Sequence, residues 1–431
     1  MQYYSLKHQA PNVDFRAATI AGQAPDGGLY FPETIPRFSP ELLASLKTLP
    51  KAELALQVMQ PYVGATIPAA ELARICAETV DFPFPVVPVT EQIAALELFH
   101  GPTLAFKDVG ARFMSRCLGY FSRQQTKKVT VLVATSGDTG GAVANGFLGV
   151  EGVDVVILYP SGKVSPVQER QLTALGQNIT ALEVQGDFDD CQQLVKQAFT
   201  DAAVTSHLTL TSANSINVAR WLPQQLYYIY AWQQWQHPEP PVVAVPSGNF
   251  GNLCAGLLAY VSGLPVRHFV AACNANDAVA GYLRTGDFMA KAAVPTLSNA
   301  MDVGNPSNFT RILELFAQSH ATISGLIHGC TVSDATTSAT IEQVYQQTGY
   351  MLDPHGAVAF HALQEYLQTQ PGQHGLFLET AHPVKFPEVV EPLIGQTIAL
   401  PEALHELMRQ PKQSTVLEPS YEALREYLLA R

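Results

Sequence analysis

From residue 127 onward, short apolar runs alternate with segments whose apolar positions recur every three or four residues. Runs of about four to eight apolar residues bounded by turns are typical of fully buried strands in parallel sheets. Strands are therefore predicted at 129–134, 153–159, 179–184, 242–245, 266–272 and 375–380. Helices are predicted at 140–147, 188–199, 216–235, 253–261 and 278–284, with Asp187 capping the second and Pro223 kinking the third. This alternation predicts parallel βαβ units in a doubly wound α/β fold.

Residues 1–95 break this rhythm with many prolines and end in Phe82-Pro-Phe-Pro-Val-Val-Pro88, a composition typical of a linker. We therefore expect an N-terminal domain over residues 1–95. The main region, 96–431, should consist of a large domain and a smaller inserted α/β domain at about 110–220. Beyond Pro383 the chain is mostly amphipathic helix, for example at 421–429, and is expected to pack against the rest.

Composition narrows the classes of function. Only 14% of the residues are charged and 47% are hydrophobic, which favours a compact protein over a disordered chain. With 431 residues the chain exceeds the usual size of one hydrophobic core, so two or three domains are expected. A net charge of −12 without any long Lys/Arg run argues against binding nucleic acid or an acidic membrane. No apolar run is long enough to cross a bilayer and the start does not resemble a signal peptide, so a cytoplasmic protein is expected.

The cysteines and histidines give no metal or disulfide signal. The six cysteines are scattered without C-x-x-C spacing, so they are expected to be core thiols. His100, His355 and His382 are expected to be structural, because no pair of histidines has metal-ligand spacing on a predicted helix. No metal site is predicted.

The segment Glu97-Leu-Phe-His-Gly-Pro-Thr-Leu-Ala-Phe-Lys107-Asp108 places a lysine after a Gly-Pro turn and apolar residues, where a helix should begin. A lysine next to an aspartate at a helix start is usually a solvated surface pair. The apolar residues before Lys107 favour instead a partly buried amine, and burial lowers the pKa of a lysine toward nucleophilic reactivity. Such an amine could bond covalently to an aldehyde.

A glycine-rich turn, Ser247-Gly-Asn-Phe-Gly-Asn252, lies between the strand at 242–245 and the helix at 253–261. Backbone N–H groups at such a turn, together with the helix dipole, form a cradle for an anion. A tight strand-to-helix connection would also use glycines. Neither a P-loop nor a G-x-G-x-x-G motif is present. An aldehyde-binding lysine and a phosphate cradle in one chain together indicate pyridoxal phosphate.

Two further polar segments follow predicted strands. Thr135-Ser-Gly-Asp-Thr139 lies at the carboxyl end of the strand at 129–134, where open parallel sheets bind ligands, although Asp138 could simply cap the next helix. Arg220 falls one turn beyond the polar helix start at 214–217. Its guanidinium is suited to a phosphate, and the alternative is a solvated arginine behind an N-cap.

The chain resembles the threonine synthases, pyridoxal-phosphate enzymes of the tryptophan-synthase β-subunit fold type, over nearly its full length. Seven blocks in order carry this resemblance: Asp26-Gly-Gly-Leu-Tyr-Phe-Pro32, Phe99-His-Gly-Pro-Thr-Leu-Ala-Phe-Lys-Asp108, Ala134-Thr-Ser-Gly-Asp-Thr-Gly140, Ser212-Ala-Asn-Ser-Ile-Asn217, Pro246-Ser-Gly-Asn-Phe-Gly251, Ser298-Asn-Ala-Met-Asp-Val-Gly304 and Thr380-Ala-His-Pro383. Seven ordered blocks are hard to match by chance, whereas one glycine-rich block would be weak. The resemblance implies doubly wound, mostly parallel sheets of the fold-type II enzymes and an additional N-terminal domain.

The resemblance also implies the site residues. Lys107 would be the catalytic residue and would bind pyridoxal 5'-phosphate covalently. The cofactor-binding set is Lys107, Gly248, Asn249, Phe250, Gly251, Asn252 and Thr380, with the phosphate on 248–252 and the Thr380 hydroxyl at the pyridine nitrogen. The substrate-binding set is Ser136, Asp138, Thr139, Lys163, Asn214, Ser215, Asn217 and Arg220. A charged Asp138 would repel the ring oxygen of the cofactor, so its carboxyl group is expected to be protonated or turned toward another group.

By this resemblance the chain is expected to be a lyase that converts O-phospho-L-homoserine and water into L-threonine and phosphate. Lys107 would act as base at the substrate Cα and move further protons while the γ-phosphate leaves and water adds at Cβ. Two alternatives stay open: a phospholyase of the same fold that releases a 2-oxo acid and ammonia, and a non-catalytic sensor of a phosphorylated amino acid. The expected partner is a small-molecule phosphorylated amino acid, and the chain is expected to be a monomer or homodimer.

Overall fold

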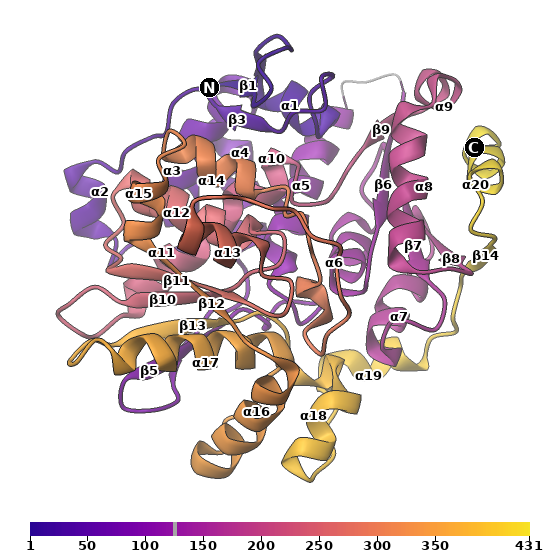
Figure 1. The fold of residues 1–431 in the computed structure, drawn as a ribbon. Helices are drawn as coiled ribbons and strands as arrows, with labels where there is room; N and C mark the ends of the chain where they lie inside the picture. Colours follow the sequence, from indigo (N-terminus) through magenta and orange to yellow (C-terminus); the bar gives the residue numbers. More distant parts are fainter. Residues whose placement is uncertain (124–126) are drawn as a thin grey trace.

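The computed structural model describes residues 1–123 and 127–431, and the strands in these ranges form three sheets (Figure 1). The N-terminal sheet is antiparallel and consists of β2 (Val13–Asp14), β1 (Gln2–Ser5) and β3 (Tyr30–Pro32), in that order. The other two sheets are parallel or mostly parallel. The predicted fold class, a mostly parallel α/β fold with an additional N-terminal part, is confirmed.

The larger parallel sheet has the strand order β12-β11-β10-β13-β5-β4. Its strands are β4 (Val86–Pro88), β5 (Ile93–Glu97), β10 (Val242–Pro246), β11 (His268–Cys273), β12 (Ile327–Thr331) and β13 (Gly375–Glu379). Neighbouring strands pair in parallel except β4, which runs antiparallel to β5 at the edge. The proline-rich stretch predicted as a linker therefore leads straight into an edge strand of this sheet.

Alternate residues of the central strands pack on opposite faces of the larger sheet. Val243 and Val245 of β10 join one core, which includes α12 (Gly251–Ser262), whereas Val242 and Ala244 join a second core with α17 (Pro354–Gln368). Figure 1 shows α17 along one side of the sheet and α12 on the other. Helices thus cover both faces of the sheet. Both faces of these strands are therefore buried, which explains why their sequences are continuous apolar runs.

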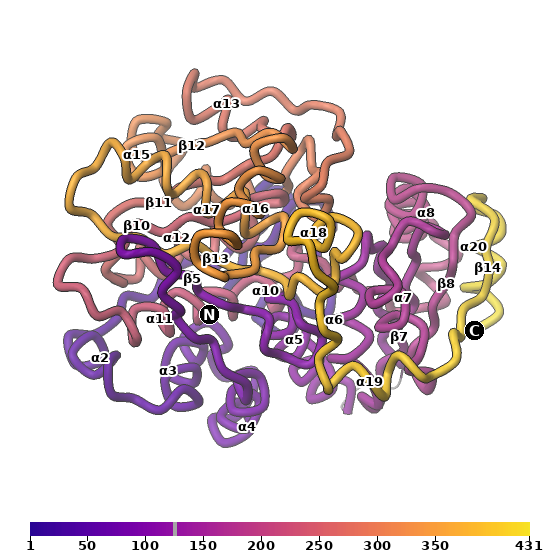
Figure 2. The backbone as a smooth tube through the Cα atoms, turned by 90° about the horizontal axis from the view of Figure 1, so that it is seen from below, coloured from indigo at the N-terminus to yellow at the C-terminus, as the bar shows by residue number. Residues whose placement is uncertain are grey.

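The smaller sheet has the order β14-β8-β7-β6-β9 and is parallel throughout. Its strands are β6 (Val129–Ala134), β7 (Val153–Pro160), β8 (Ile179–Val184), β9 (Thr209–Thr211) and β14 (Thr415–Leu417). The C-terminal tail, predicted to be mostly packing helix, therefore also completes a sheet. Figure 2 shows the tail passing through α18 (Pro387–Ile394) and α19 (Glu402–Arg409) to β14 and α20 (Tyr421–Leu429) at the outer edge of this lobe.

The remaining helices in the described ranges connect and cover the sheets. They are α1 (Phe15–Ala21), α2 (Pro40–Ser45), α3 (Lys51–Val63), α4 (Ala69–Thr79), α5 (Lys107–Ser122), α6 (Asp138–Phe147), α7 (Pro166–Thr173), α8 (Phe188–Thr200), α9 (Ala202–His207), α10 (Val218–Trp221), α11 (Gln225–Gln234), α13 (Ala278–Thr285), α14 (Phe309–Leu315), α15 (His320–Leu326) and α16 (Asp334–Thr348), with 3₁₀ turns at Gly64–Thr66, Leu222–Gln224, Asn299–Met301 and Pro383–Lys385.

Local sequence signals explain several of these boundaries. The helix predicted behind Asp187 is confirmed as α8, whose start is fixed by a capping box between Asp187 and Asp190. The long helix predicted at 216–235 is interrupted rather than kinked. Pro223 lies in the 3₁₀ turn between α10 and α11, because proline lacks an N–H and its ring clashes with a preceding helical turn.

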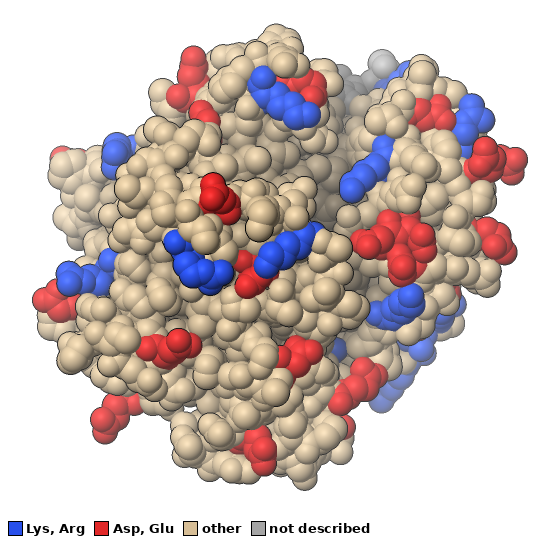
Figure 3. Space-filling model, viewed as in Figure 1, with Lys and Arg blue, Asp and Glu red and all other residues tan. Residues whose placement is uncertain are grey.

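The charged residues, the helix lengths and the cysteines show the following. Figure 3 shows acidic and basic residues interspersed on the visible face, without a large patch of one sign. In residues 1–123 and 127–431 no helix has both the length and the apolar character needed to span a membrane. All six cysteines are buried and free, and the described residues include no group of His, Cys, Asp or Glu that could hold a metal ion.

Candidate active site

A cavity of about 600 Å³ lies between the two parallel sheets. Segments that follow β6 and β9 in the smaller sheet and β10 and β13 in the larger sheet line it. The carboxyl ends of parallel strands are where open α/β sheets bind ligands. Gln23 and Leu29 of the N-terminal part complete its wall, and the surface in Figure 3 is hollowed between the two lobes. The cavity therefore joins three parts of the chain that are far apart in sequence.

Most of the residues predicted for the site line this cavity. They are Lys107, Asn249, Phe250, Gly251, Asn252 and Thr380 from the predicted cofactor set, and Ser136, Thr139, Asn214, Ser215 and Arg220 from the predicted substrate set. The other predicted residues, Gly248, Asp138, Asn217 and Lys163, are not part of this lining.

Lys107 is the first residue of α5 and lines the cavity. The loop before it is fixed from two sides. The N–H of Phe106 donates to the carbonyl of Thr380 at 2.9 Å, and the hydroxyl of Tyr227 donates to the carbonyl of Phe106. These bonds hold the lysine next to the end of β13, so the predicted neighbours Lys107 and Thr380 are indeed brought together.

Asp108 does not form a solvated pair with Lys107. Its carboxylate is buried and accepts hydrogen bonds from the N–H and the hydroxyl of Thr103, at 3.0 and 2.5 Å. The carbonyl of Thr103 in turn accepts from the buried amine of Lys385 at 2.7 Å. The surface-pair interpretation of this segment is therefore wrong, because Asp108 ties the turn that carries Lys107.

The environment of Lys107 makes its amine reactive. Burial lowers its pKa, the charge of Asp138 raises it, and the charges of Arg220 and Lys385 lower it further, to about 8. Within the part of the chain that the structure describes, no hydrogen bond or ion pair holds the amine. An amine with this pKa is partly neutral near neutral pH, so it can act as a nucleophile or as a base.

The turn from Ser247 to Asn252 has the geometry of an anion cradle. Phe250 has a left-handed φ of 60°, and the first N–H bonded within α12 is that of Cys254, to the carbonyl of Phe250 at 3.0 Å. The N–H groups just before it therefore point out of the helix start. A Cβ at Gly248 would lie 2.6 Å from the Cα of Met301, so only glycine lets this turn pack against its neighbour.

Two buried donors, on residues that line the cavity, have no hydrogen-bond partner among the described residues. The hydroxyl of Tyr228 donates to Oδ1 of Asn252 at 2.9 Å, which leaves Nδ2 of Asn252 as a buried donor without an acceptor. Nε of Arg220 is likewise buried and unpaired. Buried donors are normally satisfied, so unpaired ones in a cavity indicate ligand groups. The cradle and the Asn252 amide fit the phosphate of pyridoxal phosphate.

The loop after β6 places Asp138 behind the cavity wall. Its carboxylate accepts from Lys385 at 2.7 Å and from the amide of Gln168 at 2.9 Å. Burial would raise the pKa of Asp138, but the charges of Lys385 and Lys107 and these hydrogen bonds lower it to about 2. The carboxyl group is therefore ionised and turned toward another group, and it does not cap α6.

Arg220 is buried at the cavity, so the solvated alternative is wrong. One of its terminal nitrogens donates to the carbonyl of Ala213 at 2.5 Å. Burial lowers the pKa of Arg220 to about 10, although the charges of Tyr227 and Asp108 act in the opposite direction. Among the described residues no carboxylate lies within ion-pair distance of it. Its positive charge is thus left for an anion in the cavity.

The structure does not bring Lys163 and Asn217 into the cavity. Lys163 follows β7 and lines a separate hollow together with Ser161, Gln185, Gly186, Asp187 and Asp190. The loops directly after β6 and β9, which are neighbours in the sheet, line the cavity, whereas the loop directly after β7 lines the separate hollow. Asn217 is buried, caps α10 and donates to the carbonyl of Thr19 at 2.9 Å. The predicted contacts of Lys163 and Asn217 with the substrate stay predictions, and the positions of these two residues do not support them.

Sequence reasoning missed one wall of the cavity, which α8 provides. The residues of α8 that line it are Phe188, Gln192, Val195, Lys196, Phe199 and Thr200. Their spacing follows one face of a helix, and that face carries phenylalanines next to a lysine and a glutamine. This mixture was the available signal, because a helix that only packs would show a purely apolar stripe.

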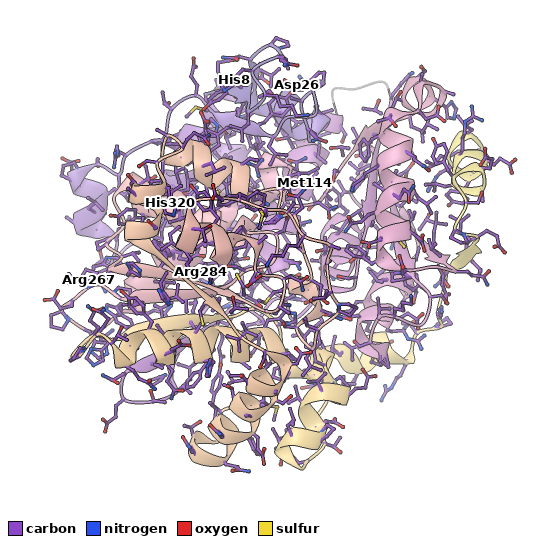
Figure 4. The ribbon with its side chains drawn as sticks, viewed as in Figure 1. His8, Asp26, Met114, Arg267, Arg284 and His320 are labelled. Atoms are coloured by element: carbon purple, nitrogen blue, oxygen red, sulfur yellow. The ribbon has the colours of Figure 1, made fainter. Side chains whose placement is uncertain are left out.

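The block Asp26-Gly-Gly-Leu-Tyr-Phe-Pro32 builds the N-terminal wall. Asp26 accepts from the hydroxyl of Ser5 at 2.7 Å and from the N–H groups of Gly28 and Gln9 at 2.8 and 3.0 Å. Figure 4 shows Asp26 beside the N-terminal segment that carries His8. The carboxylate thereby holds the turn from which Leu29 reaches the cavity.

His355 lines the cavity and holds the neighbouring turn. Its Nε2 accepts from the N–H of Ala300 at 3.2 Å, so its Nδ1 carries the proton and donates to Asp353 at 2.5 Å. The turn at 299–301 forms part of the cavity lining. The predicted structural role of His355 agrees with this geometry.

Comparison with known proteins agrees with the geometry. The family described as "Pyridoxal-phosphate dependent enzyme" matches residues 89–377, "Threonine synthase N terminus" matches residues 2–80, and "Threonine synthase, C-terminal" matches residues 356–428. The chain is 44% identical to the threonine synthase of Haemophilus influenzae, with 100% of both chains covered. It is also 44% identical to that of Escherichia coli K12, covering 100% of this chain and 99% of the other.

Solved structures give the same result. The crystal structure of threonine synthase from Escherichia coli has a TM-score of 0.92 over 100% of both chains, at 44% identity. The structure of PLP-bound threonine synthase from Brucella melitensis has a TM-score of 0.92 at 37% identity, covering 100% of this chain and 99% of that one. Maize serine racemase, at 15% identity and a TM-score of 0.54 over 77% of this chain and 92% of its own, shares the fold.

Proposed function

The chain belongs to the threonine synthase family, a family of pyridoxal-phosphate-dependent lyases that convert O-phospho-L-homoserine and water into L-threonine and phosphate, and we propose that the cavity residues perform this reaction. The observation that carries the assignment of residues is Lys107. Its buried amine, with a pKa lowered by burial and nearby cations to about 8, lies in one cavity with an anion cradle.

Pyridoxal 5'-phosphate, when bound, supplies an aldehyde for the covalent bond and a conjugated ring that withdraws electrons from the substrate. The turn at 248–252, including the unpaired amide of Asn252, would hold its phosphate. Lys107 accepts the proton of the substrate Cα and moves the later protons, because its pKa lies near the working pH. Thr380 offers a hydroxyl to the pyridine nitrogen, and a neutral hydroxyl does not hold that nitrogen protonated.

We assign the second anion, the substrate phosphate, to the part of the cavity that carries Arg220. Arg220 supplies the positive charge, and Asn214 and Ser215 supply polar groups on the same segment. Ser136 and Thr139 line the same cavity. The carboxylate of Asp138 is paired with Lys385, so its negative charge is neutralised rather than presented to the substrate.

Product analysis with O-phospho-L-homoserine tests this function against its alternatives. The purified protein with bound cofactor should release threonine and phosphate in equal amounts. A phospholyase would release phosphate with a 2-oxo acid and ammonia. A non-catalytic sensor would give no product, and lack of the cofactor absorbance in the purified protein would identify it.

Arg220→Ala is expected to lower kcat/KM for O-phospho-L-homoserine about tenfold to hundredfold, because a charge-assisted hydrogen bond to the phosphate is lost. Affinity for the cofactor, measured by its absorbance on titration, should change little. Lys163→Ala provides a comparison cation, since Lys163 lies in the separate hollow. Equal losses of cofactor and substrate affinity in Arg220→Ala would assign Arg220 to the cofactor, and a loss in Lys163→Ala would restore its predicted role.

The localisation and the oligomeric state of the protein stay predictions. We propose a cytoplasmic enzyme that works as a monomer or homodimer on a small phosphorylated amino acid. Sedimentation at micromolar concentration would distinguish the two oligomeric states.

A further inference from the structure

The hydroxyl oxygen of Ser215 receives two hydrogen bonds from the protein. Nδ2 of Asn249 and Nδ2 of Asn308 both lie 2.9 Å from it. A serine oxygen has two acceptor positions and one proton to donate. Both acceptor positions are thus occupied, and the Ser215 proton must be donated to a third group.

The direction of both amide donations is fixed by further bonds. Oδ1 of Asn249 accepts from the N–H of Ser307 at 2.7 Å, and a backbone N–H can only donate. Oδ1 of Asn308 accepts from Arg311 at 2.7 Å, and a guanidinium can only donate. Neither amide can be rotated by half a turn without placing a donor against a donor. The Ser215 oxygen is therefore obliged to accept from both.

Arg311 anchors this arrangement from inside the protein. It is fully buried, its guanidinium lies 4.3 Å from the ring centroid of Trp221, and no carboxylate pairs with it among the described residues. It donates to the carbonyls of Ser215 and Ile216 at 2.8 and 2.6 Å, and to that of Tyr30 at 3.2 Å. One residue thus fixes both the backbone of the Ser215 segment and the orientation of the Asn308 amide.

We propose that Arg311 and Asn308 are positioning residues, which force the Ser215 hydroxyl to donate its proton into the cavity, to the phosphate of the phosphorylated amino-acid substrate. This inference rests on the proposed function. Ser215 lines the cavity on the segment that carries Arg220, and no other acceptor for its proton is present among the described residues. A hydroxyl that accepts two hydrogen bonds is polarised and is a stronger donor.

The cofactor also carries a phosphate, and Asn249 belongs to its cradle. Ser215 adjoins this cradle, since a Cβ on Gly251 would lie 3.1 Å from its own Cβ. We assign its proton to the substrate phosphate because the cradle already has its own backbone donors and the Asn252 amide, whereas Ser215 shares a short segment with the unpaired charge of Arg220. The two sources are separable by experiment, because cofactor binding and binding of inorganic phosphate to the cofactor-loaded protein are measured independently.

Asn308→Asp tests the proposal in the cofactor-loaded protein. The substitution keeps the shape and gives Arg311 a carboxylate partner, but it replaces the amide donor by an acceptor, so the Ser215 proton turns to residue 308. We expect kcat/KM for O-phospho-L-homoserine to fall about tenfold to hundredfold. Affinity for inorganic phosphate, measured by titration calorimetry, should fall by a similar factor, and cofactor affinity should stay within about twofold.

Two further variants separate the proposal from simple repulsion by the new charge. In a Ser215→Ala background, Asn308→Asp should cause little additional loss, because the positioned hydroxyl is already absent. Asn308→Ala, which removes the donation without adding an acceptor, should lose less than Asn308→Asp. This variant also covers the case in which Asn308→Asp does not fold.

The outcomes are distinct. Additive losses in the double variant, an unchanged phosphate affinity in Asn308→Asp, or a loss confined to cofactor affinity would each overturn the proposal. Failure of the proposed function would appear elsewhere, in the products of the unsubstituted protein, whereas calorimetry with inorganic phosphate needs no turnover.

Discussion

Lys107→Ala is expected to lower turnover of O-phospho-L-homoserine by about 10³-fold or more. A positioned general base alone contributes about 10²–10⁴-fold, and this lysine also anchors the cofactor covalently. Its amine is suited to both tasks, because burial and nearby cations lower its pKa to about 8. Turnover would be measured as threonine and phosphate released by variant protein saturated with cofactor.

The same experiment has an internal comparison. Lys196 lines the same cavity but is an exposed residue of α8, so Lys196→Ala should keep the covalent link and its absorbance. Reduction with borohydride followed by peptide mapping should label Lys107 in the unsubstituted protein. A label on another lysine, or substantial turnover by Lys107→Ala, would show that the assignment is wrong. The thermal midpoint of the variant should stay close to that of the parent, since the amine makes no hydrogen bond to the residues that the structure describes.

Apolar runs predicted the strands well because both parallel sheets are covered on both faces. The run at 242–245 became β10, and the run at 129–134 became β6, with alternate residues in different cores. Edge elements were harder to predict. β14, a three-residue strand in the C-terminal tail, exists because β8 offers it an open edge, and its sequence has too few residues to show a period.

The site was predictable where chemistry depends on one local turn. Lys107 and the turn at 248–252 are each marked by their sequence neighbours. Apolar residues precede Lys107, and a glycine stands at position 248, where the backbone packs closely against Met301. Lys163 was harder, because a strand end does not reveal which neighbouring strand leads into the cavity. Lys385 was missed altogether, because the partners of its amine among the described residues are Asp138 and Thr103, more than two hundred residues away in sequence.

The contact between Lys385 and Asp138 leads to the second large prediction. Both side chains are buried and their charged atoms are 2.7 Å apart. Removing one partner of a buried ion pair leaves an uncompensated charge and typically costs about 3–5 kcal/mol. Lys385→Met should therefore lower the free energy of unfolding by about that amount, a large part of the total for a typical domain. Urea titrations at pH 7 would measure it.

A matched double variant tests the cause. In Asp138→Asn/Lys385→Met both charges are absent, so most of the lost stability should return. If the double variant is as unstable as Lys385→Met, the loss comes from packing or from the Thr103 carbonyl that Lys385 also bonds. A loss below about 1 kcal/mol in Lys385→Met would mean that water or Lys107 compensates Asp138.

The pH dependence of the free energy of unfolding tests the interaction between Asp138 and Lys385 independently. Burial would raise the pKa of Asp138, but Lys385 and Lys107 hold it at about 2, below its ordinary value of 3.8. A carboxyl group with a lowered pKa in the folded state stabilises the protein above its ordinary pKa, and this contribution is lost as the pH falls through about 2. Between pH 4 and pH 2 the parent should therefore lose more stability than Lys385→Met, in which the pKa of Asp138 is no longer held down by its nearest cation. The free energy of unfolding of both proteins would be measured between pH 4 and pH 2. Equal losses in the parent and in Lys385→Met would contradict this assignment and would mean that another group stabilises the charge of Asp138.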